Sequence, residues 1–220
     1  MKIIKSMHNQ KIGLFFLIFI YILSITVREV IPKNTMLSYI VLTFALIPIC
    51  RSESSYLKSK LSNLDLVYAS IFSGLMPRYL SVMALGLTGQ LVLGPPRFYS
   101  FLPLVLASII EEFYYRAKLY DELKTWVKKR NAYLITICLY SLFHIPLFDF
   151  FKLLPLLPIF LLLGILFQEL RLKWGLTSSV IAHIIYNILG MFYIVSFELL
   201  SVLIIASSLI ATILLVKFLA

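Results

Sequence analysis

Eight runs of apolar residues follow one another along the chain, separated by short segments that carry most of the charged residues. A run of about 20 apolar residues can cross a bilayer as an α-helix. The first two runs are short for a crossing, and Pro77 with Arg78 interrupts the third, so seven spans are the alternative to eight. The pattern predicts an all-α, polytopic transmembrane helical bundle with spans at 12–27, 36–50, 64–87, 98–117, 132–148, 153–170, 178–196 and 199–217.

Composition supports the membrane prediction and excludes a soluble protein. Of the 220 residues, 61% are hydrophobic and 14% are charged, and the mean hydropathy is +0.97. Soluble domains are about 45–50% apolar and about 25% charged. With eight spans and short loops, the chain has no room for a sizeable extramembrane domain.

The 20 Lys and Arg residues outnumber the 10 Asp and Glu residues. Their placement along the chain predicts the orientation of the protein in the membrane, so we do not expect a nucleic-acid partner. Cytoplasmic loops of membrane proteins are enriched in Lys and Arg. The terminal segments and every second loop hold about fourteen of the basic residues, so both termini are expected in the cytoplasm. These fourteen are Lys2, Lys5, Lys11, Arg51, Lys58, Lys60, Lys118, Lys124, Lys128, Lys129, Arg130, Arg171, Lys173 and Lys217, whereas the other loops hold Arg28, Lys33, Arg78, Arg97 and Lys152.

Few ionisable or strongly polar residues fall inside the predicted spans, and these are the candidates for chemistry. A charged side chain at the bilayer centre costs about 2.5–3.5 kcal/mol on insertion scales, so such residues usually face the protein interior and serve a function. The candidates are Glu111, Glu112 and Arg116 in the fourth span, His144 in the fifth, and His183 with Asn187 in the seventh.

The two adjacent acids of the fourth span are expected to play different roles. Glu112 and Arg116 are four residues apart and can pair on one helix face. Glu111 points about 100° away around the helix and has no cation beside it in its own helix, which makes it the candidate general base or acid. The alternative is an interfacial charge cluster at the end of the span.

The histidines and Asn187 suit the remaining steps of a hydrolysis. His183 and Asn187 are four residues apart and present hydrogen-bond donors on one helix face, which suits the stabilisation of an oxyanion. His144 lies near the end of the fifth span, where it can hold a water molecule together with Glu111. A lone histidine in an apolar run is more often a packing residue, but two histidines on different helices together with a Glu pair favour a catalytic site.

The candidate residues fall into three short motifs on successive parts of the chain. In their order and spacing these motifs resemble those of the CPBP family (CAAX protease and bacteriocin-processing enzymes, also called Abi), which are intramembrane glutamic endopeptidases. The similarity covers about residues 98–192 and extends to the segments 161–168 and 173–178. Tyr140 stands where the family usually has Phe, and Ala117 stands where Gly is common. The three motifs are Glu111-Glu112-x-x-x-Arg116, Tyr140-x-x-x-His144 and His183-x-x-x-Asn187.

The resemblance divides the chain and implies a role for each site residue. Residues 1–97 form N-terminal helices without a recognised motif, 98–192 form the catalytic core, and 193–220 form a C-terminal helix. Four residues would act on the water and on the scissile carbonyl: Glu111 would activate the water, His144 would assist in positioning it, and His183 and Asn187 would stabilise the tetrahedral oxyanion. Three further residues would organise the site, namely Glu112, Arg116 and Tyr140.

No cofactor is implied by the resemblance, and zinc is the alternative. Glu111, His144 and His183 are ligand types that, together with a water molecule, satisfy a catalytic zinc site. The chain contains no His-Glu-x-x-His, Gly-x-Gly-Asp or Gly-x-Ser-x-Gly string, so the familiar zinc, aspartyl and serine protease motifs are absent from the sequence.

The implied function is endopeptidase cleavage of a membrane-associated peptide or protein, in peptide maturation or bacteriocin self-immunity. The alternative is a non-catalytic membrane scaffold that regulates a sensor kinase or another membrane partner; a proton-relay transporter is disfavoured because no inverted repeat is visible. Because the fourth span runs toward the cytoplasm and Glu111 lies in its inner third, we expect the site near the cytoplasmic face. The residue usage is typical of a low-GC bacterium, so we expect a multi-pass protein of a bacterial cell membrane with a membrane-tethered substrate.

Overall fold

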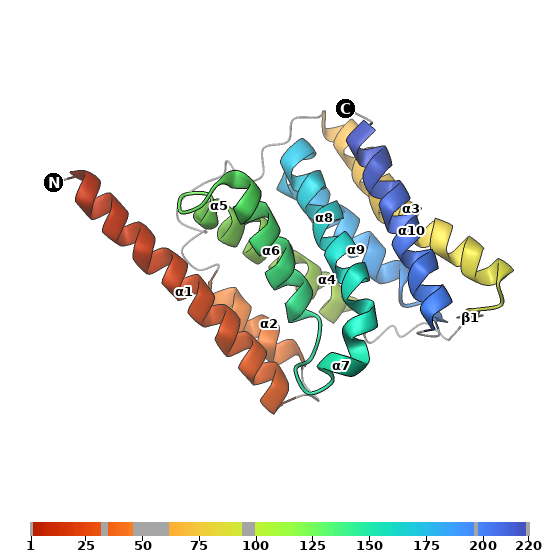
Figure 1. The fold of residues 1–220 in the computed structure, drawn as a ribbon. Helices are drawn as coiled ribbons and strands as arrows, with labels where there is room; N and C mark the ends of the chain where they lie inside the picture. Colours follow the sequence, from red (N-terminus) through yellow and green to blue (C-terminus); the bar gives the residue numbers. More distant parts are fainter. Residues whose placement is uncertain (1, 32–34, 46–61, 94–99, 196–197, 219–220) are drawn as a thin grey trace.

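The computed structural model describes residues 2–31, 35–45, 62–93, 100–195 and 198–218, which form a bundle of helices (Figure 1). Two helices begin the chain: α1 (Lys2–Val30) runs along one side of the bundle, and α2 (Thr35–Phe44) packs against it. At about 1.5 Å per residue, the ten residues of α2 reach about half of the roughly 30 Å hydrocarbon core. Within the predicted span 36–50, the described helix covers residues 36–44, and residues 46–50 lie outside the described ones.

The helices that carry the predicted motifs lie together at the centre of the bundle. The fourth predicted span is one continuous helical stretch whose middle part is a π-helix, and the helices that follow pack around it. In chain order, the elements are α4 (Phe101–Glu111), η4 (Glu112–Leu119), α5 (Tyr120–Leu123), α6 (Lys129–Phe143), α7 (Phe150–Leu153), the 3₁₀ turn η5 (Leu154–Leu156), α8 (Leu157–Trp174) and α9 (Leu176–Leu189).

The turn between α8 and α9 depends on a glycine. Gly175 has a φ of 104°, a left-handed conformation that side chains with a Cβ rarely adopt. The Gly175 N–H donates to the carbonyl of Arg171 and ends α8, and α9 begins at the next residue. The helix that carries His183 and Asn187 is thus folded back against the helix before it.

The remaining helices close the far side of the bundle. α3 (Asn63–Leu87) packs against α9 and against α10 (Leu199–Phe218). α3 passes through Pro77 as one helix, so the interruption expected at Pro77 and Arg78 is not found. Neighbouring helices often accommodate a proline within a membrane helix.

A short strand pair, which the sequence pattern did not predict, follows α3 and α9. β1 (Leu91–Leu93) pairs antiparallel with β2 (Tyr193–Val195), with Val92 opposite Ile194. The predicted span 178–196 is therefore wrong at its end, because α9 stops at Leu189 and residues 193–195 hydrogen-bond to another segment.

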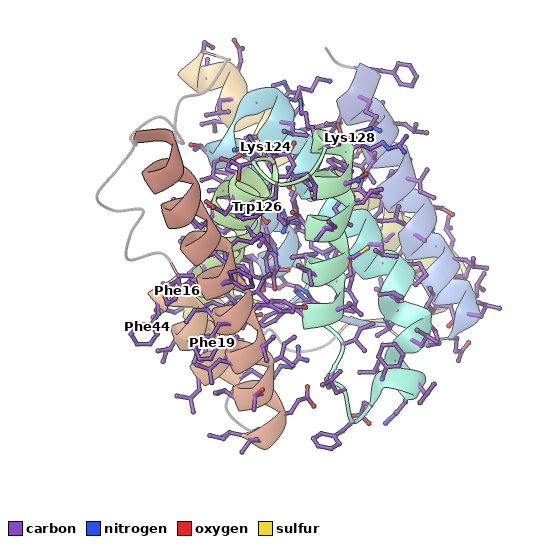
Figure 2. All side chains as sticks on the ribbon, turned by 60° about the vertical axis from the view of Figure 1, so that its left-hand side comes forward. Phe16, Phe19, Phe44, Lys124, Trp126 and Lys128 are labelled. Carbon is purple, nitrogen blue, oxygen red and sulfur yellow. The ribbon has the colours of Figure 1, made fainter. Side chains whose placement is uncertain are left out.

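The apolar helices confirm a polytopic helical membrane bundle, although not eight crossings of equal length. Four described segments are long and apolar enough to cross a membrane: Gly13–Val30, Leu64–Leu87, Phe150–Trp174 and Leu199–Phe218. α2 and α9 are apolar but shorter. Figure 2 shows large apolar side chains pointing outward from α1 and α2; Phe16, Phe19 and Phe44 are 41%, 60% and 51% exposed, as expected for a face in contact with lipid.

The two ends of the bundle differ in the segments that they carry. The first turns of α1, the last turns of α10, and the loop 124–130 between α5 and α6 lie toward one end, which we call the basic end (Figure 1). The loop 144–149, α7 and the strand pair lie toward the other, which we call the opposite end. Figure 2 shows Lys124, Trp126 and Lys128 gathered at the basic end.

Candidate active site

The two adjacent acids sit where the helix changes from α to π. α4 ends at Glu111 and η4 begins at Glu112, and at the far end of η4 the Tyr120 N–H donates to the Tyr115 carbonyl five residues earlier. Both residues themselves have α-helical dihedral angles, and the Glu112 N–H still donates to the Ser108 carbonyl four residues earlier. Both carboxylates lie against the same residue of α9, His183.

Glu112 is fully buried and has partners at both oxygens. Its Oε1 lies 2.8 Å from His183 Nδ1, and its Oε2 accepts a hydrogen bond from Ser179 Oγ. Arg116 Nε lies 3.5 Å from the same Oε2, as the four-residue spacing predicted. The structure therefore places Glu112 in a paired, charge-compensated position.

Arg116 is itself buried and is held by charge and by an aromatic ring. Its guanidinium lies over the ring of Tyr140, 4.1 Å from the ring centroid, and among the described residues it donates no hydrogen bond. Cation–π contacts are stronger when the cation is desolvated. The predicted grouping of Glu112, Arg116 and Tyr140 is thus present in the structure.

Glu111 has a different environment, because only one of its oxygens is held. Tyr39 OH donates to Oε1 at 2.7 Å. Oε2 is buried and takes part in no hydrogen bond within the described part of the chain. It lies 3.4 Å from His144 Nε2 and 3.8 Å from His183 Nε2, so it faces both histidines without a close contact to either.

The hydrogen bond made by Nδ1 of each histidine determines the protonation of Nε2, the ring nitrogen that faces Glu111. His144 Nδ1 lies 2.8 Å from the carbonyl oxygen of Tyr140, which can only accept, so Nδ1 carries a proton. His183 Nδ1 is in the same way directed at the Glu112 carboxylate. Each neutral ring therefore presents an unprotonated Nε2 toward Glu111 Oε2.

Ring stacking fixes the two histidines in place. His183 stacks on Phe167 with ring centroids 4.3 Å apart, and His144 stacks on Phe160 at 4.9 Å. Both phenylalanines belong to α8, so this helix supports both histidines. Neither was singled out in the sequence, because a Phe in an apolar helix gives no signal that separates this role from packing.

Asn187 binds α4 one helical turn before Glu111. Its side-chain nitrogen donates to Ser108 Oγ at 2.9 Å, and Ser108 precedes Glu111 by three residues on α4. Since an amide nitrogen has two N–H groups, one remains for another acceptor. The structure thus brings all seven predicted site residues to the interface of α4, η4, α6 and α9.

Two N-terminal contributions to the site were missed in the sequence. Tyr39 comes from α2, within a segment that carries no recognised motif. Arg28, at the end of α1, donates to the carbonyl of Ile145, and Glu29 accepts from the Leu147 N–H, so both hold the loop that follows His144. The sequence pattern placed Arg28 in the loop after the first span, whereas it lies in the last turn of α1 with a buried side chain.

Glu111 lies at a different place along its helix than the sequence predicts. The helical stretch that contains Glu111 runs from Phe101 to Leu123, so Glu111 lies near its middle and not in its inner third. His144 follows the last residue of α6, at the opposite end of that helix from the basic loop. The site therefore lies between the centre of the bundle and the opposite end.

No three His, Cys, Asp or Glu side chains in the described residues are arranged to hold a metal ion.

Residues 94–189 match the family model of the type II CAAX prenyl endopeptidase Rce1-like proteins, and no curated protein matches the chain. The matched segment includes every predicted site residue. The match agrees with the family predicted from the motifs: residues 94–189 are similar to the type II CAAX prenyl endopeptidase Rce1-like proteins.

Proposed function

We propose that this protein is an intramembrane endopeptidase in which Glu111 activates a water molecule for attack on a peptide bond. The observation that carries the proposal is the contrast between the two oxygens of Glu111. Oε1 is fixed by Tyr39, and the buried Oε2 faces two Nε2 atoms at 3.4 and 3.8 Å. A carboxylate oxygen fixed in direction and free of hydrogen bonds is suited to take a proton from water.

The proposed first step is proton abstraction and attack. A water molecule can donate one hydrogen to Glu111 Oε2 and the other to His144 Nε2, since both are acceptors. The O–H bond to Glu111 breaks, its proton passes to Oε2, and the water oxygen bonds to the peptide carbonyl carbon. The carbonyl π electrons move to the oxygen and form the oxyanion.

The proposed second step is collapse of this intermediate. The C–N bond breaks, and Glu111 returns its proton to the leaving amine. Asn187 can donate its second N–H to the oxyanion. His183 can donate from Nε2 only when its ring is doubly protonated, because Nδ1 already serves Glu112.

The substrate we propose is a peptide or protein tethered to the membrane, cleaved in peptide maturation or in self-immunity to a bacteriocin. The supporting features are the burial of the site within apolar helices and the family match. We propose no cofactor for this chemistry.

Glu111→Gln tests the proposal, because it keeps the shape of the side chain and removes the base. Peptide termini in the membrane fraction of cells that produce the wild-type protein are compared by mass spectrometry with those of the variant. General-base catalysis contributes about 10²–10⁴-fold, so we expect termini that depend on the protein to disappear. Glu169→Gln is the matched control: Glu169 is a half-buried acid of α8 that accepts a hydrogen bond from Tyr133 OH.

Two outcomes would contradict parts of the proposal. If Glu111→Gln leaves the cellular phenotype undiminished at equal protein abundance, the protein acts as a scaffold for a membrane partner. If a strong chelator removes activity and zinc restores it, the metal-free mechanism is wrong.

A further inference from the structure

Arg78 is a cation within an apolar helix, in the part of the chain that precedes the segment matched by the family model. α3 passes through Pro77 without a break, so Arg78 lies inside the helix and not in a loop. Its side chain is half-buried. A charged residue inside an apolar membrane helix is costly and usually serves a function. The contacts of the guanidinium indicate which function this is.

The guanidinium of Arg78 caps the last turn of α9. Its Nε donates to the carbonyl of Tyr186 at 3.0 Å, and its Cζ lies over the Tyr186 ring, 3.7 Å from the ring centroid. α9 ends three residues later, at Leu189. The last carbonyls of a helix lack partners within it and form the negative end of its dipole, so a cation there is stabilising. The cation–π contact holds the guanidinium against the ring.

Gly190, the residue that follows α9, leaves the space that the guanidinium occupies. A Cβ at Gly190 would lie 2.7 Å from Arg78 Nη2 and 3.2 Å from Cζ. The φ of Gly190 is −64°, which any residue adopts, so the backbone does not require a glycine at this position. The glycine instead makes room for the Arg78 side chain at the end of α9.

Two contacts fix the position of α9 along α3. At Gly74 the helices approach so closely that a Cβ would lie 2.5 Å from the Ala182 carbonyl oxygen. Four residues further along both helices, Arg78 holds Tyr186 by its carbonyl and its ring. The close approach prevents α9 from moving toward α3, and the hydrogen bond opposes its sliding along α3.

The two residues of α9 that α3 contacts each precede a site residue directly. His183 follows Ala182, and Asn187 follows Tyr186, so both site residues point about 100° around α9 from the contact with α3. We infer that Arg78 is a positioning residue, which fixes the last turn of α9 and thereby the place of the Asn187 amide in the site. This inference rests on the proposed protease function.

Turnover of the full chain tests the role of Arg78. It is measured as the rate at which Glu111-dependent termini appear, per amount of folded protein. Arg78→Met removes the donor and should lower turnover about 10-fold, the order expected for a lost hydrogen bond from a charged group. Arg78→Lys keeps a cation that can donate to the same carbonyl and should recover part of the loss. Arg171→Met is the matched control, because Arg171 is a half-buried arginine that pairs with Asp121 of α5. Equal losses in Arg78→Met and Arg171→Met, or no recovery in Arg78→Lys, would overturn the inference.

Gly190→Ala tests the same contact from the side of α9. The added methyl group displaces the guanidinium, so turnover should fall as it does in Arg78→Met. When Arg78→Ala is already present, the methyl group meets no guanidinium, and Gly190→Ala should cause no further loss. Residues that act through one contact show such non-additive effects. Losses that add in the double variant would show that the two residues act separately and would overturn the inference.

Hydrogen exchange tests the positioning of α9 independently of activity. In the purified protein, we expect Arg78→Met to speed amide exchange in the last turn of α9, up to Gly190, and to leave the first turn after Gly175 unchanged. Equal exchange of the last turn in variant and wild type would overturn the inference. If no terminus depends on Glu111, the protease function fails and the catalytic role of Arg78 with it, while exchange still reports whether Arg78 fixes α9.

Discussion

Glu111 and Glu112 are neighbours in the chain, but their surroundings have little in common. Glu112 accepts from Ser179, contacts His183 Nδ1 and pairs with Arg116, so both of its oxygens are engaged. Glu111 is held at one oxygen by Tyr39, and its other oxygen faces the two histidines. The difference shows how two chemically identical side chains divide into a structural carboxylate and a reactive one: the number of hydrogen bonds each receives decides which can take a proton.

The largest effect is expected when the charge of Glu112 is removed. Glu112→Gln leaves Arg116 buried without its counter-charge, and breaking a buried ion pair in this way costs about 3–5 kcal/mol. We expect a large fall in the unfolding temperature of the purified protein in detergent. Glu111→Gln, by contrast, should unfold close to the wild-type temperature while losing cleavage.

A double variant separates stability from catalysis at the same pair. Glu112→Gln combined with Arg116→Met removes both charges, so most of the lost stability should return. Cleavage should stay low, because His183 lacks its carboxylate partner. A single Glu112→Gln variant as stable as the wild type would show that Glu112 is not the structural member of the two acids.

The next largest effect is expected at Tyr39, which orients the reactive carboxylate. Tyr39→Phe removes a hydrogen bond to a charged group, worth about 1.5–3 kcal/mol. If this orientation matters in the transition state, turnover falls about 10- to 100-fold. Tyr21→Phe is the control, since it removes a hydroxyl that binds the Leu139 carbonyl and not Glu111. Equal losses in both variants, measured as turnover at matched protein amounts, would argue against a role in orientation.

A smaller effect is expected where α3 holds α9 against the two acids. A Cβ at Gly74 would lie 2.5 Å from the Ala182 carbonyl oxygen, so Gly74→Ala must push the helices apart at a cost of about 1–3 kcal/mol. Gly86 is on the same helix, and a Cβ there would have its nearest contact 3.9 Å away, with Leu91. Gly86→Ala should therefore be neutral or stabilising by about 0.5–1 kcal/mol. Unfolding temperatures that move in the same direction for both variants would contradict this.

The smallest effect is expected at Glu29, which acts on the site through the loop after His144. Glu29→Gln weakens its hold on the Leu147 N–H and should cost about 1 kcal/mol, or about fivefold in turnover. Glu198, an exposed acid that precedes α10, serves as the control position, and Glu198→Gln should leave turnover unchanged. Matching turnover in both variants would show that the loop is held without Glu29.

The sequence was sufficient to find the residues of the catalytic core but not those that support it. Ionisable residues are rare inside apolar spans, because placing them in a bilayer costs free energy. This rarity identified Glu111, His144 and His183 as candidates, and the structure places them together. Tyr39 did not stand out, because a tyrosine in an apolar run looks like any packing residue. Its role depends on the docking of α2 against α4, which no local pattern specifies.

The errors in the predicted fold have similar causes. Hydropathy detects where a segment is apolar but not where its hydrogen bonds go, so α9 was extended into residues that form a strand with Leu91–Leu93. The π-helix was not predicted for the same reason. A backbone N–H that bonds to the carbonyl five residues earlier instead of four leaves the composition of the segment unchanged. The place of Glu111 along its helix was misjudged because that helix continues to Leu123, beyond its last apolar residues.

The π-helical stretch Glu112–Leu119 makes this part of the protein sensitive to chain length. An i+5 turn contains one residue more than the α-helix needs, so deleting any one residue between Phe113 and Leu119 lets the backbone relax into an ordinary α-helix. The helix beyond the deletion would keep its facing, because the wide turn had absorbed the extra residue, and only side chains inside the stretch would change direction relative to Glu111. A relative with one residue fewer here would therefore keep the flanking helices in place and move Arg116 relative to Glu112 and the Tyr140 ring.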